Sequence, residues 1–413
     1  MKNILTFLIL FLVFISNLFS QQEAKIFTEY KNNPKASILP DFSYVGYKNG
    51  EKVMNYRASG VPTYNVKDFG AVADDDTSDK DAIISAITAA NKTGGGIIYF
   101  PKGRFIIQDI YDDLNTIWVS TSNVVFKGSG SGKGGTELFM KVPLQPKDTT
   151  KMWTTPPMLV FGSKSGEKPI GSITADAQVG DFDIQLDQTT GLTKGDWVIL
   201  TMRSKDANAI KLDLGDYEVN PEWKALYNGG LDLSVVHQIS KIKDKTITLS
   251  QPLAYPISAN LGWKVSKYNQ IEEIGIEDIA FIGNWKKPFV HHRSWLDDSG
   301  YTMINMRRIT NSWIVNCRFT DVSVGAVINN GANITVSNCE VTGNGGHEAI
   351  TNAGGTNVLL ANITDHASQW HSVGSSKTAM NTVLYKVTYP STTCFESHAS
   401  QPRNTLLDNV TGG

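Results

Sequence analysis

Histidines gathered in the last third of this 413-residue sequence are the side chains best suited to chemistry. Imidazole titrates near neutral pH, so it can accept or donate a proton during a reaction, and it is also a common metal ligand. Six of the seven histidines follow residue 290. A single residue of this kind more often serves packing or solvation than catalysis, so the grouping is what indicates a site. The candidate site residues, with their cationic and acidic companions, are His291, His292, Arg293, Tyr301, His347, Glu348, His371, Lys377, Glu396, His398 and Arg403.

The charge balance excludes a strong attraction of the whole protein to nucleic acid or anionic lipid, because the formal net charge is -2 at pH 7. Any anion binding must therefore be local. Residues 1–20 carry one lysine followed by an apolar run from Ile4 to Phe19, which is typical of a signal peptide. We expect a secreted or periplasmic monomer that binds neither nucleic acid nor a membrane.

A short motif recurs from Asn311 to the end of the sequence. It aligns Phe319, Val341, Ile363, Val387 and Val410 in one column, at intervals of 22, 22, 24 and 23 residues. A period of about 20 to 30 residues indicates a solenoid. Each unit alternates polar and β-branched residues before Gly, Asn and Ser, without helical spacing, which favours a parallel β-helix over a leucine-rich repeat.

One coil earlier, Phe281 fits the same column, but 38 residues separate it from Phe319. An interval of this length indicates one ordinary coil plus an excursion, which we place at residues 291–301. Cys317 and Cys339 also fall one coil apart in a single column. Stacked side chains point the same way, which suits the torsion of a disulfide poorly. We therefore expect two buried thiols rather than a bridge.

An amphipathic helix is predicted near the N-terminus, where Ser78 and Asp81 form a capping-box-like start before apolar residues at helical spacing. The glycines at 94–96 and the segment at 101–103 then predict two turns that flank strands. Together with the preceding Asp68-Phe69-Gly70 and an Asp-rich loop, this order of elements resembles the N-terminal signature of the pectate-lyase-like superfamily of right-handed β-helices.

The resemblance implies an all-β chain: a right-handed, single-stranded parallel β-helix over residues 62–413, whose N-terminal helix caps the open first coil. An uncovered coil would expose strand edges. Residues 21–61 are expected to be an irregular leader. Between 162 and 257 the coil pattern gives way to short strands joined by Gly and Asp turns, which predicts an inserted β subdomain beside the substrate groove. The sequence stops at Gly413 directly after a coil motif, so we expect an incomplete C-terminal end.

The repeat lines up residues that are far apart in sequence. Counting back 16 positions from the next column residue places His347 and His371 in one row with Cys394. Two positions further along the last coil lies Glu396, and His398 follows after two more. We therefore expect two stacked histidines beside a polar patch.

The block from His291 to Arg403 resembles the core of marine polysaccharide lyases of the pectate-lyase-like group, including ulvan lyases. The resemblance implies β-elimination at a uronic acid of an anionic polysaccharide, of the ulvan, pectin or alginate type. That reaction needs a group that neutralises the carboxylate, a base for the C5 hydrogen and an acid for the leaving O4. The sequence does not identify the sugar.

Residue chemistry suggests how these tasks are divided. Arginine pairs its planar fork with a carboxylate, so Arg403 or Arg293 is assigned to neutralisation. His371 is assigned as the base, and His398 or Tyr301 as the acid. The residues expected to orient or bind the sugar are His347, His291, His292, Lys377, Glu348 and Glu396.

Calcium assists several lyases of this fold, but Asp297 and Asp298 form only a weak carboxylate pair. We expect a reaction without metal or other cofactor. A transition-metal site built on His347 and His371 ranks lower, because the sequence shows no obvious third ligand.

Two other functions stay open. A glycoside hydrolase on the same scaffold needs two carboxylic acids, and Glu348 and Glu396 could supply them. A β-helix that only binds glycans is the non-enzymatic alternative. The number of histidines on one flank argues against it, since binding alone would more naturally use aromatic residues.

Overall fold

The computed structural model describes residues 23–33, 39–50 and 61–413. The chain forms two compact units, Met1–Asp41 and Phe42–Gly413. The first unit contains α2 (Lys25–Asn32). The predicted signal peptide lies outside the described residues. Within those residues, no helix is both long enough and apolar enough to cross a membrane.

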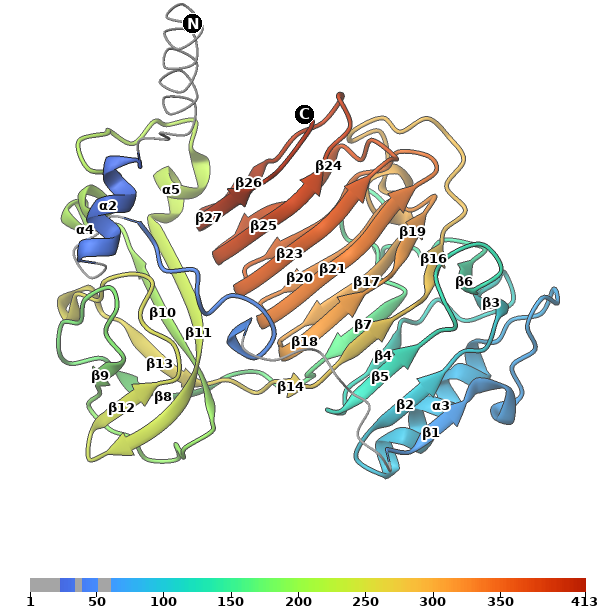
Figure 1. The fold of residues 1–413 in the computed structure, drawn as a ribbon, viewed down its shortest axis with the longest axis horizontal. Coiled ribbons are helices and arrows are strands. Elements are labelled where there is room, and N and C mark those ends of the chain that lie inside the picture. Colours follow the sequence, from blue (N-terminus) through green and yellow to red (C-terminus); the bar gives the residue numbers. More distant parts are fainter. Residues whose placement is uncertain (1–22, 34–38, 51–60) are drawn as a thin grey trace, which may run out of the picture. The chain divides into compact units, whose positions relative to one another are not determined.

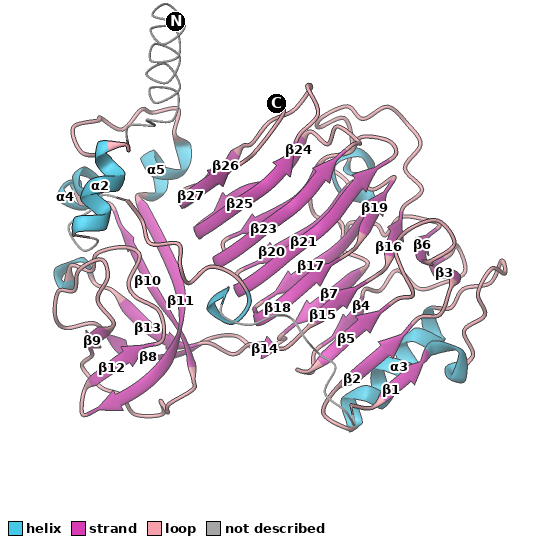
Figure 2. Cartoon of the chain, in the orientation of Figure 1, coloured by secondary structure: helices cyan, strands magenta, loops and turns pink. Residues whose placement is uncertain are grey.

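Stacked parallel strands build the second unit, and Figures 1 and 2 show them side by side in successive coils. Every strand pair in the two stacked sheets is parallel, which confirms the predicted parallel β-helix. The first sheet contains β1 (Thr63–Asn65), β2 (Gly96–Tyr99), β3 (Gly103–Gln108), β5 (Val124–Lys127), β6 (Thr136–Met140), β14 (Ile271–Glu272), β15 (Gly275–Glu277), β16 (Ala280–Ile282), β18 (Ile309–Val315), β19 (Arg318–Thr320), β21 (Ala332–Thr342), β23 (Thr356–Asp365), β25 (Met380–Thr388) and β27 (Arg403–Asp408). The second contains β4 (Ile117–Val119), β7 (Leu159–Gly162), β17 (Thr302–Arg307), β20 (Val324–Asn329), β22 (Glu348–Ala353), β24 (His371–Lys377) and β26 (Ser397–Ser400).

Columns of apolar side chains fill the interior of the coils. Phe105, Leu138, Phe281, Phe319 and Val341 follow one another in register, and all are fully buried. The rings of Phe281 and Phe319 stack with centroids 5.3 Å apart. The predicted neighbours Phe281 and Phe319 are therefore adjacent despite the long interval between them, and the intervening excursion occupies residues 283–301, between β16 and β17.

The predicted column is wrong at one step. Ile363 pairs with Cys339 rather than with Val341. Side chains alternate with a period of two along a strand, so a shift of two residues keeps every apolar side chain inside. The hydrophobic pattern cannot distinguish these two registers. Val387 then follows Ile363 as predicted.

Cys317 and Cys339 are free and buried, which confirms the expected thiols. Burial raises the pKa of both thiols, that of Cys339 to about 12. Both sulfurs therefore stay protonated and behave as small apolar groups.

An asparagine ladder runs along one turn of the coils. The amide of Asn404 donates to Asn381 (3.2 Å), Asn381 to Asn357 (3.0 Å), Asn357 to Asn333 (3.5 Å) and Asn333 to Asn49 (2.8 Å). All five residues have φ between 51° and 62°. Asparagine tolerates this left-handed conformation better than most residues, so its recurrence serves both the turn and the ladder.

The segment that ends the ladder belongs to the leader, which the sequence analysis expected to be irregular. It contains η2 (Tyr47–Gly50), and α2 lies earlier in the leader. Tyr47 is buried against Trp313, with ring centroids 5.1 Å apart, and Gly46 N donates to Asn357 O (3.0 Å). This part of the leader therefore covers the turn that carries the ladder.

The first coil is covered by α3 (Lys80–Lys92), which Figure 1 shows beside β1 and β2. Its apolar face joins the main core. The helix does not begin with a capping box, because the carboxylate of Asp79 accepts from Val72 N and Ile106 N (both 2.8 Å) instead. Burial raises the pKa of Asp79 to about 6. The short helix η3 (Val66–Phe69) precedes this region.

The inserted subdomain leaves the coils after β7 and rejoins them at β14. Its strands are all antiparallel and enclose a core of their own. The sheet runs to Lys267, beyond the predicted boundary at 257, because its last strand pairs with the first one. The subdomain contains β8 (Lys168–Ser172), β9 (Asp183–Gln185), β10 (Trp197–Ser204), β11 (Leu231–Lys243), β12 (Thr246–Leu249), β13 (Lys264–Lys267), α4 (Ala207–Leu214), α5 (Lys224–Gly229) and η4 (Ala259–Leu261).

Substitution of Asn357 by glycine tests the ladder. Asn357→Gly keeps the left-handed turn but leaves the buried amides of Asn333 and Asn381 without this partner, so we expect the free energy of unfolding to fall by about 1–3 kcal/mol. Asn362→Gly is the matched control, because Asn362 has φ 51° and an exposed side chain. Its effect should stay within about 0.5 kcal/mol. Equal losses in urea denaturation would show that the loss comes from the change to glycine itself and not from the broken ladder.

Candidate active site

The histidines meet where strands of the second sheet begin. His291 and His292 lie on the excursion between β16 and β17, His347 directly precedes β22, and His371 opens β24. His398 lies in β26. Because β22, β24 and β26 are parallel neighbours, their first residues fall at the same edge of the sheet.

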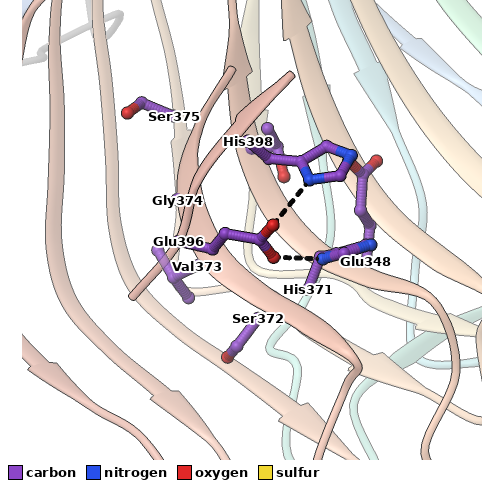
Figure 3. Close-up of a pocket in the computed structure, with 9 residues that line it drawn as sticks. Glu348, His371, Ser372, Val373, Gly374, Ser375, Glu396 and His398 are labelled. Carbon is purple, nitrogen blue, oxygen red and sulfur yellow. Dashed lines mark hydrogen bonds and ion pairs between the residues drawn. The ribbon is translucent and has the colours of Figure 1, made fainter. Parts of the chain in front are cut away.

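A single carboxylate, that of Glu396, holds two of these histidines. Figure 3 shows it between the two rings, with Oε2 2.5 Å from Nδ1 of His371 and Oε1 2.7 Å from Nδ1 of His398. Partial burial opposes ionisation of Glu396, but the hydrogen bonds from His398 and His371 outweigh it and hold the pKa of the carboxyl below its usual value. An ionised carboxylate can only accept, so each Nδ1 carries the hydrogen and each Nε2 keeps a lone pair.

His347 is fixed in the same tautomer by a backbone group. Its Nδ1 donates to the carbonyl oxygen of Asp298 (3.0 Å), and its ring centroid lies 4.9 Å from that of His371. The buried carboxylate of Asp298 also binds Nδ1 of His292 (2.6 Å). The ring of His291 stacks on that of His292, with centroids 3.6 Å apart. Burial lowers the pKa of His347 to about 4 and also lowers the pKa values of His291 and His371.

The predicted rows are displaced by one residue. His371 pairs with Glu348 rather than with His347, because three residues separate Ser376 from Met380, whereas two separate their partners Ala353 and Thr356. His398 pairs with Ser376, next to an irregularity in the pairing of β24 with β26. The rings of His347 and His371 nevertheless lie close together, with centroids 4.9 Å apart.

Glu348 lines the same pocket as His371, Glu396 and His398. Burial raises the pKa of the Glu348 carboxyl, although the electrostatic influence of His398 and Lys377 opposes this. Lys377 is exposed at the end of β24. The pocket therefore contains two carboxyl groups whose pKa values are displaced in opposite directions.

Three of the predicted catalytic or binding residues form ion pairs or pack in the core instead of facing the pocket. Arg403 binds both carboxylate oxygens of Asp213 (3.0 and 2.8 Å), and so joins the last coil to α4 of the subdomain. Arg293 pairs with Asp297 (2.6 Å). Tyr301 is buried in the main core, directly after the π-helix η5 (Leu296–Gly300). Neither arginine is therefore available to neutralise a substrate carboxylate without first leaving its aspartate.

Exposed aromatic residues beside the histidines were missed by the sequence analysis. Trp370 is 54% exposed and stacks on His291 with centroids 4.9 Å apart. Trp153 is 66% exposed and meets His292 edge-on at 5.9 Å. Trp370 directly precedes His371, which was a usable signal. Trp153 lies between strands in a segment without a repeat pattern, and no sequence signal pointed to it.

The carboxylates do not suit calcium. Asp297 accepts from Arg293 and Ser294, and Asp298 accepts from His292, so neither is open to a cation. Among the described residues, the groups with metal-ligand spacing are His291, His347 and His371, and His371, Glu396 and His398. Calcium prefers oxygen ligands, whereas sets rich in imidazole suit transition metals.

Two family models match parts of the chain. Residues 63–211 match the family described as rhamnogalacturonase A/epimerase, pectate lyase-like. Residues 368–413 match a domain of unknown function, DUF4955. The second match contains His371, Glu396 and His398, so the polar centre of the site lies in the segment that is similar to this domain of unknown function.

The chain is also similar to curated and solved proteins. It is 44% identical over 70 residues to alginate lyase 7 and 39% identical over 70 residues to mannuronan C5-epimerase AlgE6, both of Azotobacter vinelandii. Each alignment covers 17% of this chain and 8% of the relative, so it spans less than a tenth of either relative. The crystal structure of the tailspike protein gp49 from Pseudomonas phage LKA1 matches over 84% of this chain and 59% of that chain, with a TM-score of 0.53 and 12% identity. These findings confirm the predicted resemblance of the chain to the pectate-lyase-like superfamily of parallel β-helix proteins.

Proposed function

We propose that the protein is a secreted polysaccharide lyase that cleaves a uronic-acid-containing polymer, of the ulvan, pectin or alginate type, by β-elimination. The observation that carries the proposal is the Glu396 carboxylate, which accepts from Nδ1 of His371 and of His398, so that the neutral form of each ring has its lone pair on Nε2. An imidazole oriented in this way is a general base, and the carboxylate stabilises the imidazolium that forms.

His398 is the better base of the two. Its side chain is 41% exposed, whereas Nε2 of His371 is buried and cannot reach a sugar C5 hydrogen directly. Glu348 replaces Tyr301 as the candidate acid for the leaving O4, because it shares the pocket and its raised pKa favours the protonated form. Trp370 and Trp153 offer exposed rings on which sugar units can stack.

The local relatives support the same substrate class. The relatives are named as an alginate lyase and a mannuronan C5-epimerase. Both β-elimination and epimerisation at C5 of a uronic acid require removal of the C5 hydrogen. A base held by a carboxylate serves that step in either reaction. The resemblance to lyases and the histidine-rich pocket favour elimination here.

A glycoside hydrolase is the second candidate, because one specific observation favours it. Glu348 and Glu396 line one pocket, with pKa values displaced upward and downward respectively. Glycosidases need such a pair, one carboxyl protonated and the other ionised. However, both oxygens of Glu396 accept hydrogen bonds from histidines. The carboxylate is therefore poorly placed to attack a sugar as a nucleophile or to activate a water as a base.

The deciding measurement follows ultraviolet absorbance and reducing ends while the protein is incubated with ulvan, pectate, alginate and chondroitin. We expect one polymer to yield an unsaturated uronyl product that absorbs in the ultraviolet. New reducing ends without this absorbance would identify a hydrolase. Exchange of the C5 hydrogen with solvent deuterium in an uncut polymer would identify an epimerase.

Removal of the proposed base should abolish most turnover. We expect His398→Ala to lower kcat/KM by roughly 10²–10⁴-fold, the usual contribution of a general base. His366→Ala is the matched control, because His366 is exposed and lies outside the cluster. Formation of the unsaturated product at a near-wild-type rate by His398→Ala would exclude this residue as the base.

Glu396 acts through the histidines, so its replacement should change turnover more than binding. In Glu396→Gln, one amide oxygen can accept from only one Nδ1, and the second ring loses its tautomer. We expect kcat to fall about 10–100-fold with little change in KM. Glu396→Asp, which restores two acceptor oxygens, should recover part of the loss. A rise in KM at constant kcat would instead show that Glu396 binds the sugar.

A further inference from the structure

Three imidazole nitrogens point to a ligand that none of the roles assigned above involves. Nε2 of His291, His347 and His371 is buried in each case and has no hydrogen-bond partner. A buried polar atom without a partner costs about 1–3 kcal/mol. One ring nitrogen from each of the three residues lies within 4.8 Å of one from each of the others. Three such atoms gathered together favour a shared ligand.

The hydrogen bonds behind two of these rings are of the kind that metal-binding histidines make. A histidine that binds a metal usually donates its other ring hydrogen to a carboxylate or a backbone carbonyl. His371 donates to Glu396 (2.5 Å) and His347 to the carbonyl of Asp298 (3.0 Å). Both rings are thereby fixed with the Nε2 lone pair free, and no proton must leave before a cation binds.

We propose that His291, His347 and His371 bind one divalent transition-metal ion of the zinc class through their Nε2 atoms. The sequence alone shows no third ligand for a transition-metal site built on His347 and His371. The excursion before β17 supplies that ligand, His291. Three imidazoles leave a fourth position open to water or to an oxygen of a substrate.

The distances permit this assignment after a small closure. Nitrogen–zinc bonds of about 2.0–2.1 Å place tetrahedral ligands roughly 3.4 Å apart. The nitrogens here lie within 4.8 Å of one another, so no pair needs to approach by more than about 1.4 Å. His291 lies on the excursion rather than on a strand, and rotation of its side chain can provide part of this movement.

The second histidine group is a poorer site. His371, Glu396 and His398 also have ligand spacing, but Glu396 already uses both oxygens to accept from the two Nδ1 atoms. A metal among these atoms would break both hydrogen bonds. The three unpartnered Nε2 atoms require no such loss.

The ion would also complete the proposed reaction, and this role rests on the proposed function. His371 adjoins His398, with ring centroids 4.2 Å apart, so a cation bound at His371 lies near the proposed base. It would neutralise the uronate carboxylate, the task for which neither Arg403 nor Arg293 is free. Binding of the metal is independent of that role.

Titration of the full-length protein with Co²⁺ after removal of bound metal with a chelator tests the site directly. We expect one equivalent to bind and to give the visible absorption of four-coordinate cobalt, and Zn²⁺ to displace it. His347→Ala should weaken binding at least about 100-fold, since losing a ligand exceeds the loss of an outer-shell partner. Absence of binding by the wild-type protein would overturn the proposal.

Two further variants distinguish the proposed site from the neighbouring histidine group and from misfolding. His398→Ala should retain the cobalt spectrum. Loss of the spectrum in this variant would indicate that the ion binds to the group that contains Glu396. His347→Gln keeps a polar side chain, and its thermal unfolding without metal should match that of the wild type, so that lost binding cannot be ascribed to misfolding. Undiminished binding by both His347 variants would show an adventitious ion.

Activity is measured separately on the same samples. Metal binding without cleavage of any polymer would reject the lyase and leave the metal site intact. Cleavage that persists at full rate in metal-free protein would reject the catalytic role of the ion. The two proposals therefore fail by different results.

Discussion

The stacking register of neighbouring coils is the constraint on which the candidate site depends. The strands that begin near His347, His371 and His398 are parallel neighbours, so residues more than 20 positions apart in sequence become adjacent in space. Interior columns and the asparagine ladder fix this register, and the leader residue Asn49 terminates the ladder. A slip of one residue would turn each imidazole toward a different face. Packing inside the coils thus sets the chemistry at the ends of the strands.

Two oxygen acceptors then decide what the histidines can do. Glu396 serves His371 and His398, while the backbone and side chain of Asp298 serve His347 and His292. Each acceptor holds a hydrogen on Nδ1 and so leaves a lone pair on Nε2. Burial keeps His347 and His371 neutral, whereas His398 is partly exposed. The histidines therefore form two classes. His347 and His371 have enclosed Nε2 lone pairs, whereas His398 is in contact with solvent.

The sequence predicted the parallel coils because apolar residues recur at the coil period, and it predicted the grouping of the histidines for the same reason. It could not predict the register at Ile363, since a two-residue slip leaves the pattern unchanged. Contacts with residues outside the repeat could not be predicted either. Asp213, which accepts a hydrogen bond from Arg403, belongs to the subdomain, and His291 lies on an excursion without a sequence repeat. Repeats thus predict neighbours within the solenoid, whereas contacts of inserted segments require the folded structure.

The proposed metal and the proposed base would be coupled through Glu396, and this coupling would distinguish the site from a simple binding cluster. Its carboxylate is shared by His371, a proposed ligand, and His398, the proposed base. A cation on Nε2 of His371 would strengthen the donation of Nδ1–H to the carboxylate, because coordination makes the ring hydrogen more acidic. The shared negative charge would then be less available to His398, which would make that imidazole a weaker base. A uronate carboxylate bound at the open position of the ion returns negative charge to the metal and opposes this effect. Such an arrangement would make His398 most basic when an acidic sugar is in place.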